Sequence, residues 1–460
     1  MKKNLLSKYS LEIIILISFF TYFYLSLSKL GLFYYRFYDF GLAVNTISSI
    51  SQGEIWRLFF GHVSLVYAPL SVIYLIINDS YIYSIFLLFL NNLIICFFIY
   101  KVSKKYSKNL VLSLLLIFSP QIWWVSNLGF NIEIFLLIII LNIIDALEEN
   151  KFSSLCVNLF FMMLIKEVYI ILSITSLSIY YFIYKEKTKT IFFIFTILIL
   201  LFVIQYSLIN YFSFNNQVTL YHLKNNLGLF DYKRKFLELI IFIAPLILFI
   251  KKIKIIDLIS FPLVILMFFF GNSAIFAVYN HYLIFLIPSL FLIIFKGFHS
   301  LTHKKFFFLL LFLFHMSFTN SPIGIIGLVN KNDFFHIKES SYNNPGLKIF
   351  LKKYIPEDSY IMINNNIGIP ELYGYKNLQS ISRDFKYEYF KINYENLFSD
   401  NFKTVKNEDI DFIIYDDSKD FFVNDKILND YEKKSFFEYL SKSFSIYANY
   451  KDLVILKSIN

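Results

Sequence analysis

Long apolar runs are the feature that most limits what this chain can fold into. Two examples are LEIIILISFFTYFYLSLSKL at 11–30 and IIDLISFPLVILMFFFGNSAIFAV at 255–278. A helix of about 20 apolar residues crosses the roughly 30 Å hydrocarbon core of a bilayer. Hydrophobic residues make up 57% of the chain and charged residues only 17%, which excludes a soluble globular protein. We therefore expect an all-α polytopic membrane protein.

Basic residues fix the expected topology, because Lys and Arg gather at the cytoplasmic ends of spans. Lys2, Lys3 and Lys8 precede the first apolar run, so we expect the N-terminus inside and the chain in the cytoplasmic (plasma) membrane. That run is too long for a removable signal peptide and lacks a small-residue cleavage site. About eleven transmembrane helices follow from this reading. They are expected at 10–30, 81–100, 109–127, 132–147, 152–165, 168–184, 190–209, 236–250, 255–276, 278–295 and 304–319.

The transmembrane domain is expected to occupy 1–320, with a large first outer loop at 31–80. The apolar stretch LVYAPLSVIYLII in that loop is too short to span and predicts a re-entrant or interfacial helix. From about 320 the sequence turns polar, and strand-like SYIMINNN, DFIIYDD and DLVILKSI alternate with helix-like NPGLKIFLKKY and DYEKKSFFEYLSKSF. The sequence predicts a small C-terminal α/β domain at 321–460 on the outer face.

Composition also limits the partners. The net charge of +10 reports topology and contact with membrane lipids, and no basic patch carries a nucleic-acid-binding motif. Cys96 and Cys156 both lie inside apolar runs, so neither a disulfide nor a metal site is predicted. We assign no metal ligand and expect no cofactor.

Several ionisable side chains fall at outer ends of the expected spans or in the first outer loop. Such groups are costly at membrane depth and usually mark a site or a pathway. Each also has a structural explanation: Asp39 or Glu133 as a helix cap, His62 as a loop residue, and Lys166 with Glu167 as a turn pair. The candidates are Arg36, Asp39, His62, Glu133, Lys166, Glu167 and His281.

Five segments occur in the order found in a known family. They are YDFGLAVN (38–45), HVSLVYAP (62–69), GFNIE (129–133), IKEV (165–168) and YNHYLIFLIPSLFLII (279–294). With them the chain resembles a family of predicted polytopic membrane proteins called domain of unknown function twenty seventy-nine. That family is distantly similar to the type C glycosyltransferases, which take a sugar from a polyprenyl-phosphate carrier.

The resemblance places family motifs on particular residues. It puts an aromatic-Asp-x-Gly motif on Tyr38, Asp39 and Gly41, His-x-Ser on His62 and Ser64, and His-Tyr before a Pro-bearing span on His281 and Tyr282. Two motifs are altered. Where the family has Asp-Phe-His-Pro-Glu, this chain keeps only the Phe and Glu133, and where it has Lys-Glu-Asp, Val168 replaces the Asp.

The resemblance implies an inverting transfer of a sugar from a polyprenyl-phosphate donor to an outer-face acceptor. Asp39 would be the catalytic base, and a nearby cation, Arg36, Arg57, Lys166 or His281, would neutralise the departing phosphate. His62, Glu133 and Glu167 would join in binding substrate. Two alternatives stay open: a transporter or flippase for a lipid-linked or small polar substrate, and an inactive membrane scaffold. The C-terminal domain shows no catalytic motif.

Overall fold

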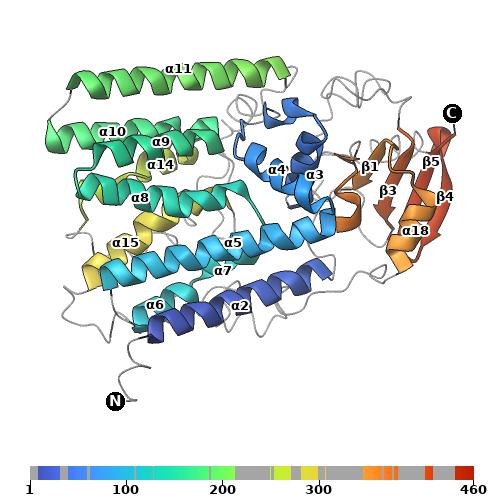
Figure 1. The fold of residues 1–460 in the computed structure, drawn as a ribbon, viewed down its shortest axis with the longest axis horizontal. Helices are drawn as coiled ribbons and strands as arrows, with labels where there is room; N and C mark the ends of the chain where they lie inside the picture. The colour runs from blue at the N-terminus through green and yellow to red at the C-terminus, as the bar shows by residue number, and fades with distance from the viewer. Residues whose placement is uncertain are drawn as a thin grey trace.

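A computed structural model describes most of the helical part of the chain and the core of the C-terminal domain. The described residues are 9–31, 40–59, 63–107, 110–127, 129–185, 188–212, 249, 253–270, 281–298, 306, 346–364, 367–375, 378–381, 410–417 and 441–459. They form a helical domain with a small sheet at one end (Figure 1). The expected helical fold and C-terminal sheet are thus confirmed.

Four segments are long and apolar enough to cross a membrane. They are α2 (Ser10–Gly31), α5 (Ser80–Val102) with the turn after it, the segment Glu167–Tyr184 that contains α10 (Ile170–Tyr184), and α11 (Thr188–Phe212). Their positions agree with the spans predicted at 10–30, 81–100, 168–184 and 190–209. Side by side, α2 and α5 form one layer of the domain (Figure 1).

Other expected spans appear as shorter helices. The segment 109–127 forms two helices, α6 (Leu110–Ile117) and α7 (Pro120–Asn127), because Pro120 lacks the N–H that a continuous helix needs and fits the first turn of a new one. Four more of the expected spans also appear as shorter helices. The spans expected at 132–147, 152–165, 255–276 and 278–295 contain, in that order, α8 (Leu136–Glu148), α9 (Phe152–Ile165), α14 (Phe261–Phe270) and α15 (Ile287–Phe298). The spans expected at 236–250 and 304–319 lie outside the described residues, apart from Phe249 and Phe306. The number eleven therefore stays a prediction.

Short 3-10 turns lead into several of these helices. They are η4 (Ile132–Phe135), η5 (Glu167–Tyr169), η8 (Ile255–Leu258) and η10 (His281–Leu286). A π-helical turn, η3 (Ser103–Ser107), follows α5. The η turns matter for the site because η4, η5 and η10 carry residues that the sequence singled out.

The first loop folds into α3 (Leu42–Ser51), η2 (Ile55–Phe59) and α4 (Tyr67–Ile77). Helix α4 is short, as predicted for LVYAPLSVIYLII, and α3 packs beside it. Most of α3 is buried, including its polar residues Asn45 and Ser48. This part of the chain sits between the long helices and the sheet (Figure 1).

The C-terminal domain holds a five-stranded sheet in the order β2-β1-β3-β5-β4. In one half of the sheet, β1 (Ile361–Asn364) pairs in parallel with β2 (Leu378–Ile381) and β3 (Phe412–Asp416). In the other half, β5 (Leu453–Ser458) runs antiparallel to both β3 and β4 (Phe444–Tyr450). Strands β1, β3 and β5 and the helix α18 (Gly346–Tyr354) match predicted elements. Phe444 starts β4, although the sequence placed it at the end of a helix.

The turn Pro370–Tyr375, which begins as η11 (Pro370–Leu372), joins the sheet domain to the helical domain. Ser80, the first residue of α5, donates a hydrogen bond to the Pro370 carbonyl oxygen at 2.8 Å. The C-terminal domain therefore docks where α5 begins. Lys101 and Lys105 lie at the other end of the same segment, so the sheet and these lysines are at opposite ends of the helical domain (Figure 1).

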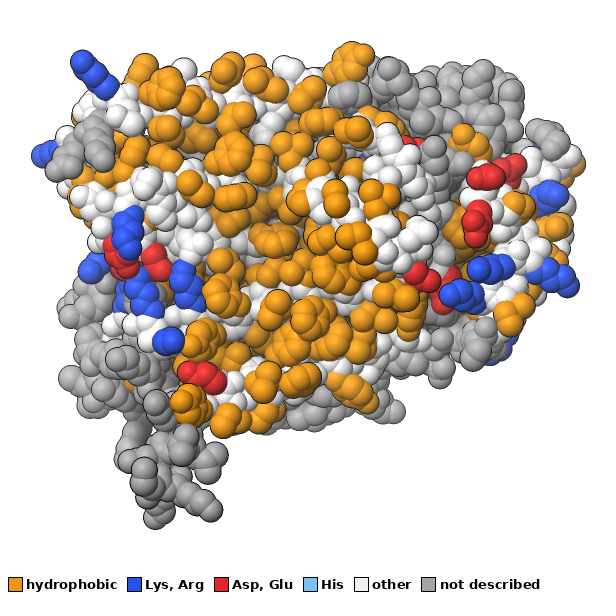
Figure 2. Space-filling view, viewed as in Figure 1, with side chains coloured by type: hydrophobic (Ala, Val, Ile, Leu, Met, Phe, Trp, Pro, Cys, Tyr) orange, Lys and Arg blue, Asp and Glu red, His pale blue; other side chains and the backbone are white. Residues whose placement is uncertain are grey.

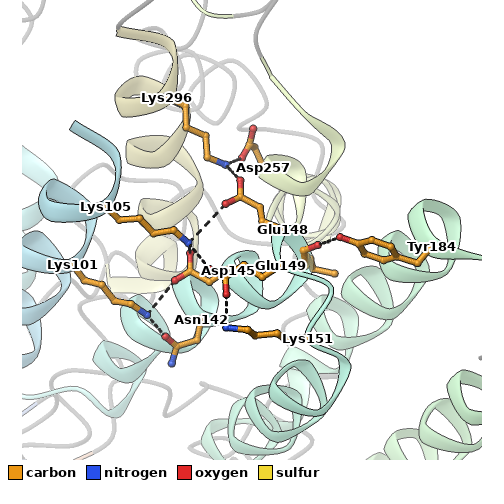
Figure 3. Close-up of polar contacts among 11 residues, drawn as sticks. Lys101, Lys105, Asn142, Asp145, Glu148, Glu149, Lys151, Tyr184, Asp257 and Lys296 are labelled. Carbon is orange, nitrogen blue, oxygen red and sulfur yellow. Dashed lines mark hydrogen bonds and ion pairs between the residues drawn. The ribbon is translucent and has the colours of Figure 1, made fainter. Parts of the chain in front are cut away.

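An ion-pair network closes the end of the helical domain that carries Lys101 (Figure 3). Lys105 lies 2.6 Å from Asp145, and Lys296 lies 2.6 Å from both Glu148 and Asp257. These residues come from η3, α8, η8 and α15, whose ends the positive-inside rule placed on one side. The structure brings those ends together.

An apolar belt separates the two charged ends of the molecule. Figure 2 shows hydrophobic side chains covering the middle of one face, with Lys, Asp and Glu at the network end and again on the sheet domain. Exposed Phe20 and Ile17 on α2 and exposed Phe192 and Phe193 on α11 belong to this belt. Such a surface suits a lipid environment, since a soluble monomer rarely exposes so large an apolar area.

Candidate functional site

A buried ion pair connects two of the predicted site residues. Lys166 Nζ contacts Glu133 Oε1, and the Glu133 side chain is 2% exposed and that of Lys166 15%. Glu133 lies in η4, just before α8, and Lys166 directly follows α9. Both residues thus sit at helix ends, and the fold brings two segments of the chain together that are 33 residues apart.

Glu167 links this pair to the first loop. Its Oε2 accepts a hydrogen bond from the backbone N–H of Val63 at 3.1 Å, and Ser64 Oγ donates to the Ile165 carbonyl oxygen at 3.4 Å. Glu167 is buried, as are Val63 and Ser64. The chain just after His62 is therefore held against the end of α9.

Tyr67, the first residue of α4, is electrostatically coupled to the same site. Burial raises the pKa of its phenol well above the usual range, and the nearby Glu133 carboxylate raises it further. The hydroxyl consequently stays protonated and can donate a hydrogen bond at any physiological pH. Sequence reasoning did not single out Tyr67, although it lies inside the HVSLVYAP motif.

The altered GFNIE motif has clear structural roles. Asn131 Oδ1 accepts a hydrogen bond from the Glu133 backbone N–H at 2.9 Å, so Asn131 caps the turn that carries Glu133. Gly129 has a φ of +83°, and a Cβ there would lie 3.0 Å from the ring of Phe40. Phe40 follows Asp39 in the chain and is fully buried. The motif therefore contacts the chain next to Asp39.

The turn that begins with His281 packs against this region. η10 contacts η4, and the ring of Phe285 in η10 lies 6.5 Å from the ring of Tyr169 in η5. The backbone of His281 thus starts a turn that lies next to the Glu133 and Glu167 turns. The side chain of His281 lies outside the described part of the structure, as do residues Arg36, Asp39 and His62.

Arg57, considered above as a phosphate-neutralising cation, is engaged elsewhere. Its Nε lies 2.6 Å from Glu54 Oε2, and its Nη1 donates to Asn45 Oδ1 at 3.0 Å. Burial lowers the pKa of the guanidinium, while Glu54 opposes that effect. These contacts tie Arg57 to Glu54 and to α3.

Lys29 is a buried cation that sequence reasoning missed. It lies in the last turn of α2 and is 2% exposed. Ser26, one turn earlier, donates to the Ser126 carbonyl oxygen at 3.3 Å, so this face of α2 points toward α7. The spacing of Tyr22, Ser26 and Lys29 on one helical face was the signal available in the sequence.

The described part of the site offers paired carboxylate and ammonium groups. No three His, Cys, Asp or Glu side chains meet as a metal site among the residues that the structure describes. Glu133, Lys166, Glu167 and Tyr67 supply acceptors, a cation and a hydroxyl donor in a largely desolvated setting. Such a set can orient a substrate that has hydroxyl groups and a negative charge.

In comparisons with known proteins, no protein-family model, curated protein or solved structure matches the chain. The chemistry of the site therefore rests on the contacts of its own residues.

Proposed function

We propose that this protein is an integral membrane glycosyltransferase that moves a sugar from a polyprenyl-phosphate donor to an acceptor on the outer face of the cytoplasmic membrane. The observation that carries the proposal is the convergence of the ordered motifs. Glu133 pairs with Lys166, Glu167 holds the chain after His62, η10 packs on η4, and Phe40 packs on Gly129. Segments from five parts of the chain thereby form one region.

The reaction proposed for this region needs one base and one cation. Asp39 takes the proton of the acceptor hydroxyl while the acceptor oxygen bonds to the anomeric carbon. The bond from that carbon to the phosphate oxygen breaks, and its electron pair leaves with the polyprenyl phosphate. The leaving group is already a stable anion, so no general acid is required. Lys166 supplies positive charge where the anion develops.

The location of the site supports transfer over transport. A transporter binds its substrate near the bilayer midplane, at the interface of repeated halves. Here Glu133, Lys166 and Glu167 all lie at helix ends. The first loop contacts the junction of α9 and η5, which carries Lys166 and Glu167. The C-terminal domain docks on that same loop through α3 and on the start of α5. A large loop and a polar domain beside the site suit an acceptor that arrives from outside.

The assignment of Asp39 is tested by Asp39→Asn in membranes supplied with labelled polyprenyl-phosphate sugars. We expect transfer to fall at least about 100-fold at unchanged protein level, because the amide cannot accept the proton. Asp358→Asn, which changes an exposed acid in the C-terminal domain, is the matched control and should transfer at the wild-type rate. Unchanged transfer by Asp39→Asn rules out the base. Movement of intact labelled lipid across the membrane without transfer supports the flippase alternative.

A further inference from the structure

Two lysines and two tyrosines form a continuous row on the surface of the C-terminal domain. Lys353 Nζ lies 5.0 Å from the centre of the Tyr354 ring, and Lys457 Nζ lies 5.0 Å from the centre of the Tyr447 ring. The two rings meet edge to face, with their centres 5.7 Å apart. We call these four residues the Lys-Tyr row. They come from α18, β4 and β5, so tertiary folding brings them together.

The Lys-Tyr row is open to solvent and supported from the sheet. Tyr447 is 43% exposed, and both lysines of the row are exposed. The Tyr447 ring also packs on Phe412, a buried residue of β3, with 5.8 Å between the ring centres. The sheet therefore holds the ring in place, whereas the flexible lysine side chains reach into water.

The surroundings of the row are basic. The stretches 346–354 and 441–459 contain six lysines and one acid, Asp452. One of the six, Lys348, lies 4.0 Å from Asp79 at the start of α5. Lys442 and Lys451 flank β4, a strand without a charged residue. A surface with this balance of charge is complementary to an anion.

The row lies far from the junction between the two domains. Asn45 of α3 donates hydrogen bonds to the carbonyl oxygens of Tyr373 and Tyr375, at 3.1 and 2.9 Å, in the turn between β1 and β2. These strands form one side of the sheet, and β4 is its last strand on the other side. Figure 1 shows β4 at the end of the molecule away from the long helices. A ligand in water is therefore better placed to reach the row than a lipid beside the apolar belt.

Tyrosine rings next to lysines suit a sugar that carries acid groups. The face of a tyrosine ring packs against the C–H groups of a sugar ring, and an ammonium group binds a carboxylate or a phosphate. An inorganic anion would use the lysines alone. The combination of rings and cations in one row therefore favours an acidic glycan.

We propose that the Lys-Tyr row binds an acidic glycan and so holds the acceptor of the sugar transfer on the C-terminal domain. The role of the glycan as acceptor rests on the proposed function, whereas its binding does not depend on it. On this view the C-terminal domain contributes acceptor recognition and no catalytic group.

Binding is measured with the full chain in nanodiscs of phosphatidylcholine. The probe is an oligogalacturonide, in which each sugar carries a carboxylate, and its methyl ester is the uncharged control. We expect Lys353→Gln/Lys457→Gln to weaken binding of the oligogalacturonide at least about fivefold, because two charge-assisted contacts are lost. The matched variant Lys352→Gln/Lys442→Gln removes the same charge from exposed lysines that contact no described ring. It should change the affinity less than about twofold, since salt screens charges outside the contact.

The contribution of the rings is tested by Tyr447→Thr, which keeps a residue suited to a strand. It should weaken binding of the oligogalacturonide at least about threefold, because an aromatic contact is lost. The lysine variants keep the test decisive if Tyr447→Thr unfolds, since they change exposed side chains only. In the transfer assay, an excess of oligogalacturonide should slow transfer by the wild type, because it competes with the acceptor.

Several outcomes overturn the inference. They are equal losses in the two lysine pairs, equal binding of the methyl ester, or no binding of the oligogalacturonide by the wild type. It is also overturned if the row lysines are needed for attachment to vesicles of equal parts phosphatidylcholine and phosphatidylglycerol and not for binding the oligogalacturonide. Transfer that the oligogalacturonide does not slow overturns the acceptor role. Binding that needs the row, in a protein that transfers no sugar from any donor, upholds the glycan surface and overturns the proposed function instead.

Discussion

At the scale of single residues, the buried Glu133–Lys166 ion pair is an arrangement that the stability of the fold does not by itself require. Removing two charges from water costs several kcal/mol per ion, and apolar residues of similar volume usually serve as well or better. A buried pair is therefore weak support for a structural role. Its position beside the first loop and η10 favours a role in binding instead.

Removing one partner of this pair should be costly. We expect Lys166→Met to lower the free energy of unfolding by about 3 kcal/mol, because it leaves the Glu133 carboxylate buried without its cation. The double variant Glu133→Gln/Lys166→Met should regain most of that loss. Thermal unfolding in detergent micelles measures both. Lys151→Met, which breaks an exposed pair with Glu149, is the control and should cost far less than Lys166→Met. Equal losses in the single and double variants would contradict this account.

At the scale of elements, α4 is an apolar helix of 11 residues with one buried and one exposed face. Leu70 and Tyr74 on one face are buried, whereas Val72, Leu75 and Ile76 on the other are exposed, Ile76 by 80%. The helix ends at Asn78 in a left-handed conformation, and Asp79 then caps α5 by accepting from the Ile82 backbone N–H. An exposed apolar face beside the long helices suits the headgroup region of a membrane.

The lipid contact of α4 can be measured by spin labelling in nanodiscs. With both native cysteines replaced, a label at Ile76→Cys should be more accessible to oxygen, which concentrates in lipid, than to a polar nickel reagent. A label at Lys442→Cys, on an exposed part of the C-terminal domain, should show the opposite preference. The same polar preference at both positions would place α4 in water.

At the scale of the whole molecule, the junction between the two domains carries a titratable group. Glu371 lies in the docking turn, and burial raises the pKa of its carboxyl. Asp79 at the start of α5 raises this pKa further, whereas Lys348 of α18, 4.0 Å from Asp79, lowers it.

Docking of the C-terminal domain should therefore weaken as the pH rises. A raised pKa in the folded state contributes stability that is complete below the ordinary value of 4.5 and is lost as the pH passes the raised value. Hydrogen exchange of residues 367–375 should accordingly become faster, beyond the intrinsic pH effect, as the pH rises above 4.5. Glu371→Gln should remove that dependence, and Glu357→Gln, which changes an exposed acid, should keep it. A protein whose exchange shows the same pH dependence with and without Glu371 contradicts the prediction.

Much of the fold followed from the sequence because hydrophobic length and basic flanks are local signals. They predicted the spans that became α2, α5, α10 and α11, and strand-like stretches in the polar C-terminal part predicted β1, β3 and β5. The break between α6 and α7 was missed, although Pro120 marks it. β2 has only four residues, and the start of β4 lies in a stretch of helical composition, so neither gave a strong local signal.

The sequence by itself determined that the chain has helices apolar enough for a membrane and which polar residues stand out near the ends of its helices. Only the tertiary structure decided which of them meet: Glu133 with Lys166, Glu167 with the chain at Val63, Arg57 with Asn45, and Asn45 with the turn of a domain more than 300 residues away. The physical reason is that hydropathy and propensity depend on neighbours in the chain. Ion pairs and hydrogen bonds between distant segments depend on how the helices pack, which no local pattern records.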